Sequence, residues 1–434
     1  MAEQILRRHG NWQRLRWNII GALVSSLIPY FIRFQINPLS DTTDLLNITL
    51  AGSFLGSLIG IFLLRSLNNF PGVQGSIYIL PSFLSGYGIV FFAFLFGRLY
   101  YSRSIFISAL VLCLLWFYVT YFRNQRRKGQ AIGIVPLGAA TRLTSIDQIE
   151  WRTLTDPNND VSSLSAIAAD LRADLSDEWE RTLTDYALTG LPVYHSKQLL
   201  ESLTGQVELE HLSENSFGSL APVSAYMAFK HFLDWCSALL ALVLLLPLLL
   251  LIVLVIRIDS PGAAIFRQQR IGYRGRPFTV YKFRSMTMKA DTDTDTDTDT
   301  DTDTDTDART NAMTQSNDQR VTKIGRLLRT SRLDELPQLF NVLKGEMSWI
   351  GPRPEAEILS RWYESEIPFY RYRHIVRPGI TGWAQVSQGH VAAVEDVRHK
   401  LHYDFYYIKH FSPWLDILIV ARTIRTMATG FGAR

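Results

Sequence analysis

The sequence has little cysteine and little charge. Two cysteines, Cys113 and Cys236, lie in apolar runs of the 434-residue chain, which excludes a disulfide framework and a cysteine-rich metal site. Charged residues make up 19% of the chain and hydrophobic residues 47%. So low a charged share is unusual for a soluble protein and indicates a membrane protein. No small-residue cleavage site follows the first apolar run, so we expect no cleavable signal peptide.

The chain also lacks any recognised nucleic-acid-binding motif, so we expect no nucleic-acid partner. Its formal net charge of +4 includes nine aspartates in a strict Asp-Thr alternation at residues 291–307, and the remainder carries +13. Such a basic remainder suits anionic lipid headgroups and phosphorylated substrates. Because Asp and Thr are poor helix formers and like charges repel, residues 291–307 are predicted to form a disordered loop.

Apolar segments of about 20 residues, the length that crosses a bilayer as a helix, dominate the first 125 residues. They lie at residues 17–34, 45–64, 76–97 and 104–122. Gly52, Gly56 and Gly60 recur every four residues in the second, so one of its faces should let another helix approach closely. Basic residues gather before and after the four segments, which predicts that both ends are cytoplasmic. Residues 1–125 are therefore predicted to form a four-helix transmembrane bundle.

The composition becomes that of a soluble domain in residues 126–222, where short strands and helices alternate. We predict a small cytoplasmic α/β domain, Rossmann-like, with a strand starting near Ala131 and a helix at about 164–179. Gly133 and Gly138 do not have the GxGxxG spacing of a dinucleotide site. A structural or regulatory domain is therefore the preferred interpretation.

A fifth apolar segment, residues 230–260, is long enough to span the bilayer. Two features favour a re-entrant helix that returns to the same face. Basic residues flank both of its ends, and Pro247 lies within it, where a proline kinks a helix. The segment opens the third predicted domain, residues 223–434, a re-entrant helix with a mainly helical α+β catalytic domain.

A pair of carboxylates, Asp334 and Glu335, lies at the centre of this last region. Residues 333–343 are predicted to form a helix that places the pair at its N-terminus, where backbone N–H groups favour anions. An ionised Asp334 could attack phosphorus once the phosphate charge is neutralised, and Glu335 could hold Mg²⁺. An isolated pair of this kind would more often be an ordinary solvated helix start.

Several basic side chains nearby could bind phosphate. The candidates are Lys282, Arg284, Arg326, Arg329, Arg332, Arg353 and Arg377. Lys282 and Arg284 follow a predicted β-hairpin turn at Gly272 and point to one side of an extended chain. Arg353 and Arg377 lie in turns rich in Pro and Gly. Aromatic residues near the C-terminus suit either a membrane-facing surface or the core of the domain.

Three motifs of this region, YKFRSM, RLDELPQLFNVLKGEMSWIGPRPE and RPGITGWAQV, resemble those of the bacterial sugar transferase family, the monotopic polyprenyl-phosphate phosphoglycosyl transferases. The resemblance covers about residues 225–434, and the layout is similar to that of long-form members that initiate exopolysaccharide, O-antigen or capsule synthesis. Members usually have Ser-Pro at the kink of the re-entrant helix, where this chain has Leu246-Pro247.

The resemblance implies a two-step phosphotransferase reaction. Asp334 would take the sugar-phosphate from a UDP-sugar with release of UMP, Glu335 would assist with Mg²⁺, and polyprenyl (undecaprenyl) phosphate would accept it. It implies a multi-pass protein of the bacterial inner membrane with its catalytic domain on the cytoplasmic face. Membrane lipid and a second copy of the chain, as a homodimer, are further expected partners. The alternative is a catalytically inactive membrane scaffold or regulator of polysaccharide synthesis.

Overall fold

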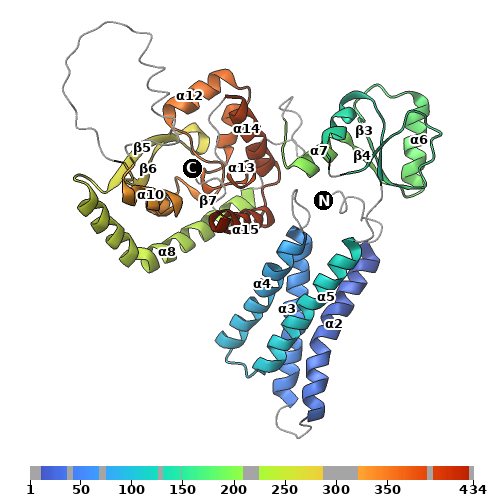
Figure 1. Ribbon diagram of the computed structural model, residues 1–434, viewed down its shortest axis with the longest axis horizontal. Helices are drawn as coiled ribbons and strands as arrows, with labels where there is room; N and C mark the ends of the chain where they lie inside the picture. The colour runs from blue at the N-terminus through green and yellow to red at the C-terminus, as the bar shows by residue number, and fades with distance from the viewer. Residues whose placement is uncertain are drawn as a thin grey trace. The chain divides into compact units, whose positions relative to one another are not determined.

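The structure is a computed structural model of the chain (Figure 1). It describes residues 11–36, 43–67, 75–125, 131–147, 149–208, 224–286, 321–388 and 394–429. The loop predicted at residues 291–307 therefore lies outside the described residues. The chain divides into two compact units, Met1–Gly205 and Gln206–Arg434.

Four long helices begin the first unit, and Figure 1 shows them side by side. They are α2 (Asn11–Ile36), α3 (Thr43–Leu67), α4 (Gly75–Phe96) and α5 (Arg103–Gln125). Each is long and apolar enough to cross a membrane. The predicted glycine face of α3 is confirmed, because α4 packs on it. A Cβ at Gly60 would lie 2.4 Å from the Phe83 ring, and one at Gly56 would lie 3.3 Å from the Tyr87 Cα.

The rest of the first unit is a parallel sheet of order β2-β1-β3-β4 with helices on it. Its elements are β1 (Ala131–Ile134), η2 (Gly138–Ser145), β2 (Trp151–Thr153), β3 (Leu164–Ala169), α6 (Asp177–Leu188), β4 (Val193–His195) and α7 (Ser196–Thr204). The helix predicted at 164–179 is wrong, because Leu164–Ala169 forms β3, one of the two central strands. Its buried position makes it almost continuously apolar, a pattern that cannot distinguish a buried strand from a helix. The helix begins later, with Ser176 as its N-cap.

The second unit starts with α8 (Ser224–Asp259) and the antiparallel hairpin of β5 (Ile265–Ile271), η4 (Tyr273–Gly275) and β6 (Pro277–Phe283). The predicted hairpin is thereby confirmed. After residue 320 come α10 (Lys323–Thr330), η5 (Leu333–Gln338), α11 (Leu339–Leu343), β7 (Ser348–Ile350), α12 (Glu357–Glu366), η6 (Tyr370–Ile375), β8 (Gly379–Thr381), α13 (Trp383–Ser387), α14 (Val394–Lys409) and α15 (Pro413–Thr429). Strands β7 and β8 pair in parallel.

Helix α8 is bent into two arms (Figure 1). A straight helix of its 36 residues would be about 54 Å long, but Pro247 interrupts its hydrogen bonding. Both arms pack against the same unit. Ala238 of the first arm joins a core with Phe278, whereas Ile252 of the second arm joins one with Phe283. The two arms therefore lie along the two ends of strand β6, and their outward side chains are apolar and exposed.

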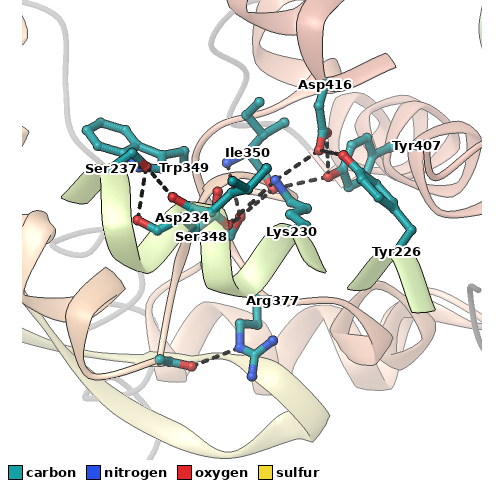
Figure 2. A network of polar contacts seen from close by, with 12 residues as sticks. Tyr226, Lys230, Asp234, Ser237, Ser348, Trp349, Ile350, Arg377, Tyr407 and Asp416 are labelled. Atoms are coloured by element: carbon teal, nitrogen blue, oxygen red, sulfur yellow. Dashed lines mark hydrogen bonds and ion pairs between the residues drawn. The ribbon is translucent and has the colours of Figure 1, made fainter. Parts of the chain in front are cut away.

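A buried polar network fixes the first arm of α8 to the C-terminal helices (Figure 2). The Lys230 ammonium lies 3.0 Å from Asp416 and 3.6 Å from Asp234. The Tyr226 hydroxyl donates to Asp416 at 2.6 Å, and the Tyr407 hydroxyl lies 2.9 Å from the same carboxylate. Because each charge here has an opposite charge or a hydroxyl beside it, the network holds the arm without leaving an unpaired buried ion.

The C-terminal aromatic residues mostly pack in the core of this unit. Tyr363, Tyr370, Tyr406 and Tyr407 are all buried, and the Tyr406 ring stacks on Trp383. Of the two interpretations of these aromatic residues, core packing therefore holds for these four tyrosines.

Candidate active site

Three separate elements bring a lysine, a glutamate and an arginine together. Lys282 lies near the end of β6, Glu335 in the first turn of η5, and Arg353 in the loop after β7. The Lys282 ammonium donates to Glu335 Oε1 at 3.2 Å, and Arg353 Nη2 donates to the same oxygen at 2.8 Å. Arg332 Nη1 lies 3.9 Å from it. The structure thus gathers three predicted site residues around one carboxylate oxygen of a fourth.

The charges of this cluster alter one another because Glu335 is only 7% exposed. Burial opposes its ionisation, but Arg353 and Lys282 outweigh burial and hold the pKa of Glu335 well below its usual range. Burial lowers the pKa of Lys282 to about 8, and the Glu335 charge opposes that shift. Arg353 is held protonated, since Glu335 raises its pKa. Glu335 is therefore an ionised carboxylate bound by cations near neutral pH.

Asp334 differs sharply from its neighbour. It is 9% exposed, and among the described residues its Oδ1 atom is buried without a hydrogen-bond partner. Burial raises the pKa of Asp334, and the negative charge of Glu335 raises it further. A buried carboxylate oxygen with no donor beside it is poorly solvated, which makes it a stronger nucleophile than an exposed one. The two carboxylates are thus equipped for different tasks.

The backbone that presents the pair is helical over residues 333–343, as predicted, but it is not one regular α-helix. Residues Leu333–Gln338 form a 3-10 helix, and the α-helix α11 that follows is only five residues long. The residue before η5, Arg332, has φ +58° in the left-handed region, which turns the chain sharply there. The predicted position of the pair at the start of a helix is therefore confirmed, although the first turns are a 3-10 helix and not an α-helix.

The loop that carries Arg353 is held at every carbonyl from Pro352 to Glu355. Prolines 352 and 354 lack an N–H group and fix φ, so this loop can be held mainly through its acceptors. The donors, in chain order of the carbonyls, are Gly379 N, Arg373 Nη2, Arg270 Nη1 and Ile271 N. The Glu355 carboxylate also accepts from Lys400 at 2.5 Å. Such complete restraint fixes where the Arg353 guanidinium can reach.

Of the other predicted phosphate ligands, Arg329 lies near Asp334, whereas Arg326 and Arg284 do not contact the carboxylate pair. Arg329 donates to Ser285 Oγ at 2.8 Å and is close enough to Asp334 to lower its pKa. Arg326 is exposed on α10. Arg284 donates to the Ser260 and Pro261 carbonyls at 2.6 and 2.8 Å, so its guanidinium closes the end of α8.

Arg377 lies apart from the cluster, below α8 in Figure 2. Its Nε donates to the Gly345 carbonyl at 3.0 Å, and its guanidinium carbon is 5.2 Å from the centre of the Tyr273 ring. These contacts place Arg377 beside the hairpin tip, at the opposite end of β6 from Lys282. It is not among the cations that surround Glu335.

Sequence reasoning missed Arg270, Arg373, Lys400 and Asp404. Arg270 is partly buried near Arg353, and desolvation lowers its pKa to about 10. Arg373 and Asp404 form an ion pair of 2.9 Å behind the loop. Nothing in their sequence positions links them to Glu335, because they lie far along the chain. A signal existed only for Glu355, which ends the IGPRPE motif.

The residues present fit a magnesium ion. All three cations approach Oε1 of Glu335. Among the described residues, Asp334 Oδ1 has no hydrogen-bond partner. The described residues hold no cluster of three His, Cys, Asp or Glu side chains able to bind a metal alone. This donor set suits Mg²⁺, which is commonly held by one or two carboxylates together with substrate phosphates.

Comparison with known proteins identifies the family. The model of the bacterial sugar transferase family matches residues 225–430. A UDP-N-acetylgalactosamine-undecaprenyl-phosphate N-acetylgalactosaminephosphotransferase of Aeromonas hydrophila is 41% identical over 447 residues, covering 99% of each chain. A UDP-glucose:undecaprenyl-phosphate glucose-1-phosphate transferase of Xanthomonas campestris pv. campestris is 42% identical over 200 residues, 46% of this chain and 38% of the relative. With a relative of this similarity along its whole length, the chain belongs to the bacterial sugar transferase family.

Proposed function

We propose that this chain transfers a sugar-1-phosphate from a UDP-sugar to polyprenyl phosphate, releasing UMP and starting a lipid-linked surface polysaccharide. Family membership and the full-length relative support a phosphotransferase of this kind. The observation that carries the covalent route is the buried, unpartnered Oδ1 of Asp334 beside a cation-bound Glu335. An inactive scaffold is the weaker alternative, because the chain retains both carboxylates and the cations around them.

The reaction has two displacements at one phosphorus atom. Asp334 attacks the phosphorus that bears the sugar, a P–O bond to its carboxylate forms, and the bridging P–O bond breaks to release UMP. A phosphate oxygen of polyprenyl phosphate then attacks the same phosphorus, and the bond to Asp334 breaks. The carboxylate is regenerated, and the sugar leaves on a lipid diphosphate. Both steps need the negative charge on the transferred group to be neutralised.

The residues around Asp334 supply that neutralisation. Lys282 and Arg353 are held in place by Glu335, and Arg329 is close to the nucleophile. Glu335 is the residue that would hold Mg²⁺, which would add positive charge beside the diphosphate and help to orient the donor. Because Lys282 and Arg353 share the Glu335 charge, they are positioned before the donor arrives, which lowers the cost of reorganising them.

We place this unit on the cytoplasmic face of the inner membrane, with α8 as a re-entrant helix. Two observations support this. Both arms of α8 pack against one unit, and the outward side chains Leu240, Leu244 and Leu250 are each more than half exposed. A helix that spanned the membrane would carry its two ends to opposite faces, whereas the two packed arms return the chain to one face. The polyprenyl phosphate headgroup would then lie at the depth of the site.

The test is a transfer assay on membranes that contain the full chain. Undecaprenyl phosphate and Mg²⁺ are supplied with a panel of radiolabelled UDP-sugars, and organic-phase label is counted. UDP-N-acetylgalactosamine is the first donor to test, because the full-length relative is named for it. We expect label with at least one donor, none with Asp334→Asn, and none after chelation of divalent cations. Normal turnover by Asp334→Asn would contradict the covalent route, and no label with any donor would favour the scaffold.

A further inference from the structure

A buried ion pair behind the active-site loop is the feature with no assigned role. Arg373 of η6 is 3% exposed, and Asp404 of α14 is 2% exposed. Arg373 Nη2 lies 2.9 Å from Asp404 Oδ2 and also donates to the Arg353 carbonyl at 2.8 Å. Its Nη1 donates to the Tyr370 hydroxyl at 2.7 Å. One buried guanidinium therefore connects α14 to the backbone of the residue that binds Glu335.

Stability alone is a poor explanation for this pair. Removing two charges from water costs several kcal/mol, and replacing a buried pair by apolar residues is often neutral or stabilising. The cost is visible at Asp404, where burial raises the pKa of the carboxyl although Arg373 and Lys400 oppose the shift. What an apolar replacement could not do is donate a hydrogen bond to the Arg353 carbonyl.

Helix α14 holds the loop at a second point as well. Lys400 lies one turn before Asp404, so both project from the same face of the helix. The Lys400 ammonium donates to the Glu355 carboxylate at 2.5 Å. The loop is thus bound at two points, at the Arg353 carbonyl through Arg373 and at the Glu355 carboxylate through Lys400. Pro352 and Pro354 flank Arg353, and because their rings fix φ, the loop cannot adjust by rotation about φ at these residues.

We propose that Asp404 is a positioning residue, which acts through Arg373 to hold Arg353 on Glu335. This inference rests on the proposed function and deepens it. Asp404 fixes the orientation of Arg373, Arg373 fixes the Arg353 carbonyl, and the restrained backbone keeps the Arg353 guanidinium 2.8 Å from Glu335 Oε1. Without Asp404, the Arg353 guanidinium is no longer held in position beside Glu335. Asp404 itself contacts neither the substrate nor the nucleophile.

The first measurement is a kinetic double-mutant cycle with Asp404→Asn and Arg353→Lys in the full chain. Asparagine has nearly the volume of aspartate, so packing is kept while the negative charge that faces Arg373 is lost. We expect kcat to fall about 10–100-fold, the scale of a small misplacement at a reacting centre, with little change in KM for the UDP-sugar. Because Asp404 acts through Arg353, adding Asp404→Asn to Arg353→Lys should lower kcat little further.

The matched control is Asp416→Asn, which breaks another buried ion pair of this unit, with Lys230 at 3.0 Å. We expect it to lower the melting temperature and the amount of folded enzyme. Any fall in kcat that Asp416→Asn causes should multiply with the fall caused by Arg353→Lys, because the Asp416 side chain does not contact the 352–355 loop. If Asp404→Asn also multiplies with Arg353→Lys, its role is structural only and the proposal is overturned.

The second measurement needs no activity. The Gly379 and Ile271 amides donate to the Pro352 and Glu355 carbonyls at 3.0 and 3.2 Å. Hydrogen exchange at both amides should speed up in Asp404→Asn and stay at the wild-type rate in Asp416→Asn. Unchanged exchange at both amides in Asp404→Asn would overturn the proposal. If the wild-type chain transfers no sugar but the two variants differ in exchange in this way, the proposed function is refuted. The positioning role of Asp404 then remains intact.

Discussion

The cluster around Glu335 predicts a large loss of stability on removing one charge. In Glu335→Gln the side chain keeps its size, but Lys282 and Arg353 lose their shared counter-charge. At an effective dielectric constant of about 20, the pairs at 2.8 and 3.2 Å are each worth about 5–6 kcal/mol of Coulomb energy. Repulsion between the two cations and the desolvation of all three groups offset part of this. A net loss of about 3–5 kcal/mol is expected when one partner of such a buried pair is removed.

The assay is thermal unfolding of the full chain in detergent, followed by a probe in the second unit. For a unit of about 200 residues, that loss lowers Tm by about 6–20 °C. The control is Glu357→Gln, the same substitution at an exposed ion pair with Arg361, for which less than about 1 kcal/mol is expected. A drop for Glu335→Gln no larger than that of Glu357→Gln would refute the view that these cations depend on Glu335.

Three further outcomes are expected. Asp334→Asn should abolish transfer yet leave Tm equal or higher, since it removes a buried carboxylate whose Oδ1 has no partner among the described residues; a clear fall in Tm would contradict this. Burial opposes the ionisation of Glu355, but Lys400 and Arg373 hold its pKa below the usual value. The ionised Glu355 therefore contributes fully to the free energy of unfolding above about pH 4.3, and this contribution is lost on further acidification. Below that pH, the stability of Glu355→Gln should fall less steeply than that of the wild type. Gly325→Ala should cost about 1–3 kcal/mol in denaturant unfolding, because its Cβ would lie 2.0 Å from the Ser285 carbonyl oxygen, whereas Gly88→Ala meets nothing within 4 Å and should cost little.

Local patterns predicted the elements well where one residue type decides the geometry. Gly272 and the alternating side chains around it predicted the hairpin that delivers Lys282. Pro247 predicted the interruption of α8, because a proline removes a helix hydrogen bond wherever it lies. The strand at Leu164–Ala169 was missed since burial on both faces erases the alternation that marks a strand.

The candidate site was predictable only as a set of residue types. Asp334, Glu335, Lys282 and Arg353 could be named because they lie in recognisable motifs. The partners of Arg284 and Arg377 could not, because a guanidinium that suits a phosphate suits a backbone carbonyl equally well. Arg373 and Asp404 depend on the packing of α14 against the loop, which no local pattern encodes. The left-handed turn at Arg332 is likewise set by tertiary contacts, since arginine has no preference for it.

The two-armed packing of α8 also bears on how the chain is made. Phe278, Val280 and Leu339 of the second unit are buried partly by the first arm, and Phe283 and Leu328 partly by the second. A ribosome releases α8 before any of these residues, so the proposed insertion of α8 into the lipid would create the surface on which the later chain condenses. A fragment that begins after residue 260 would expose this apolar surface and should aggregate rather than fold. On the proposed insertion of α8, the membrane would take part in biogenesis and would not only be the place where the finished protein resides.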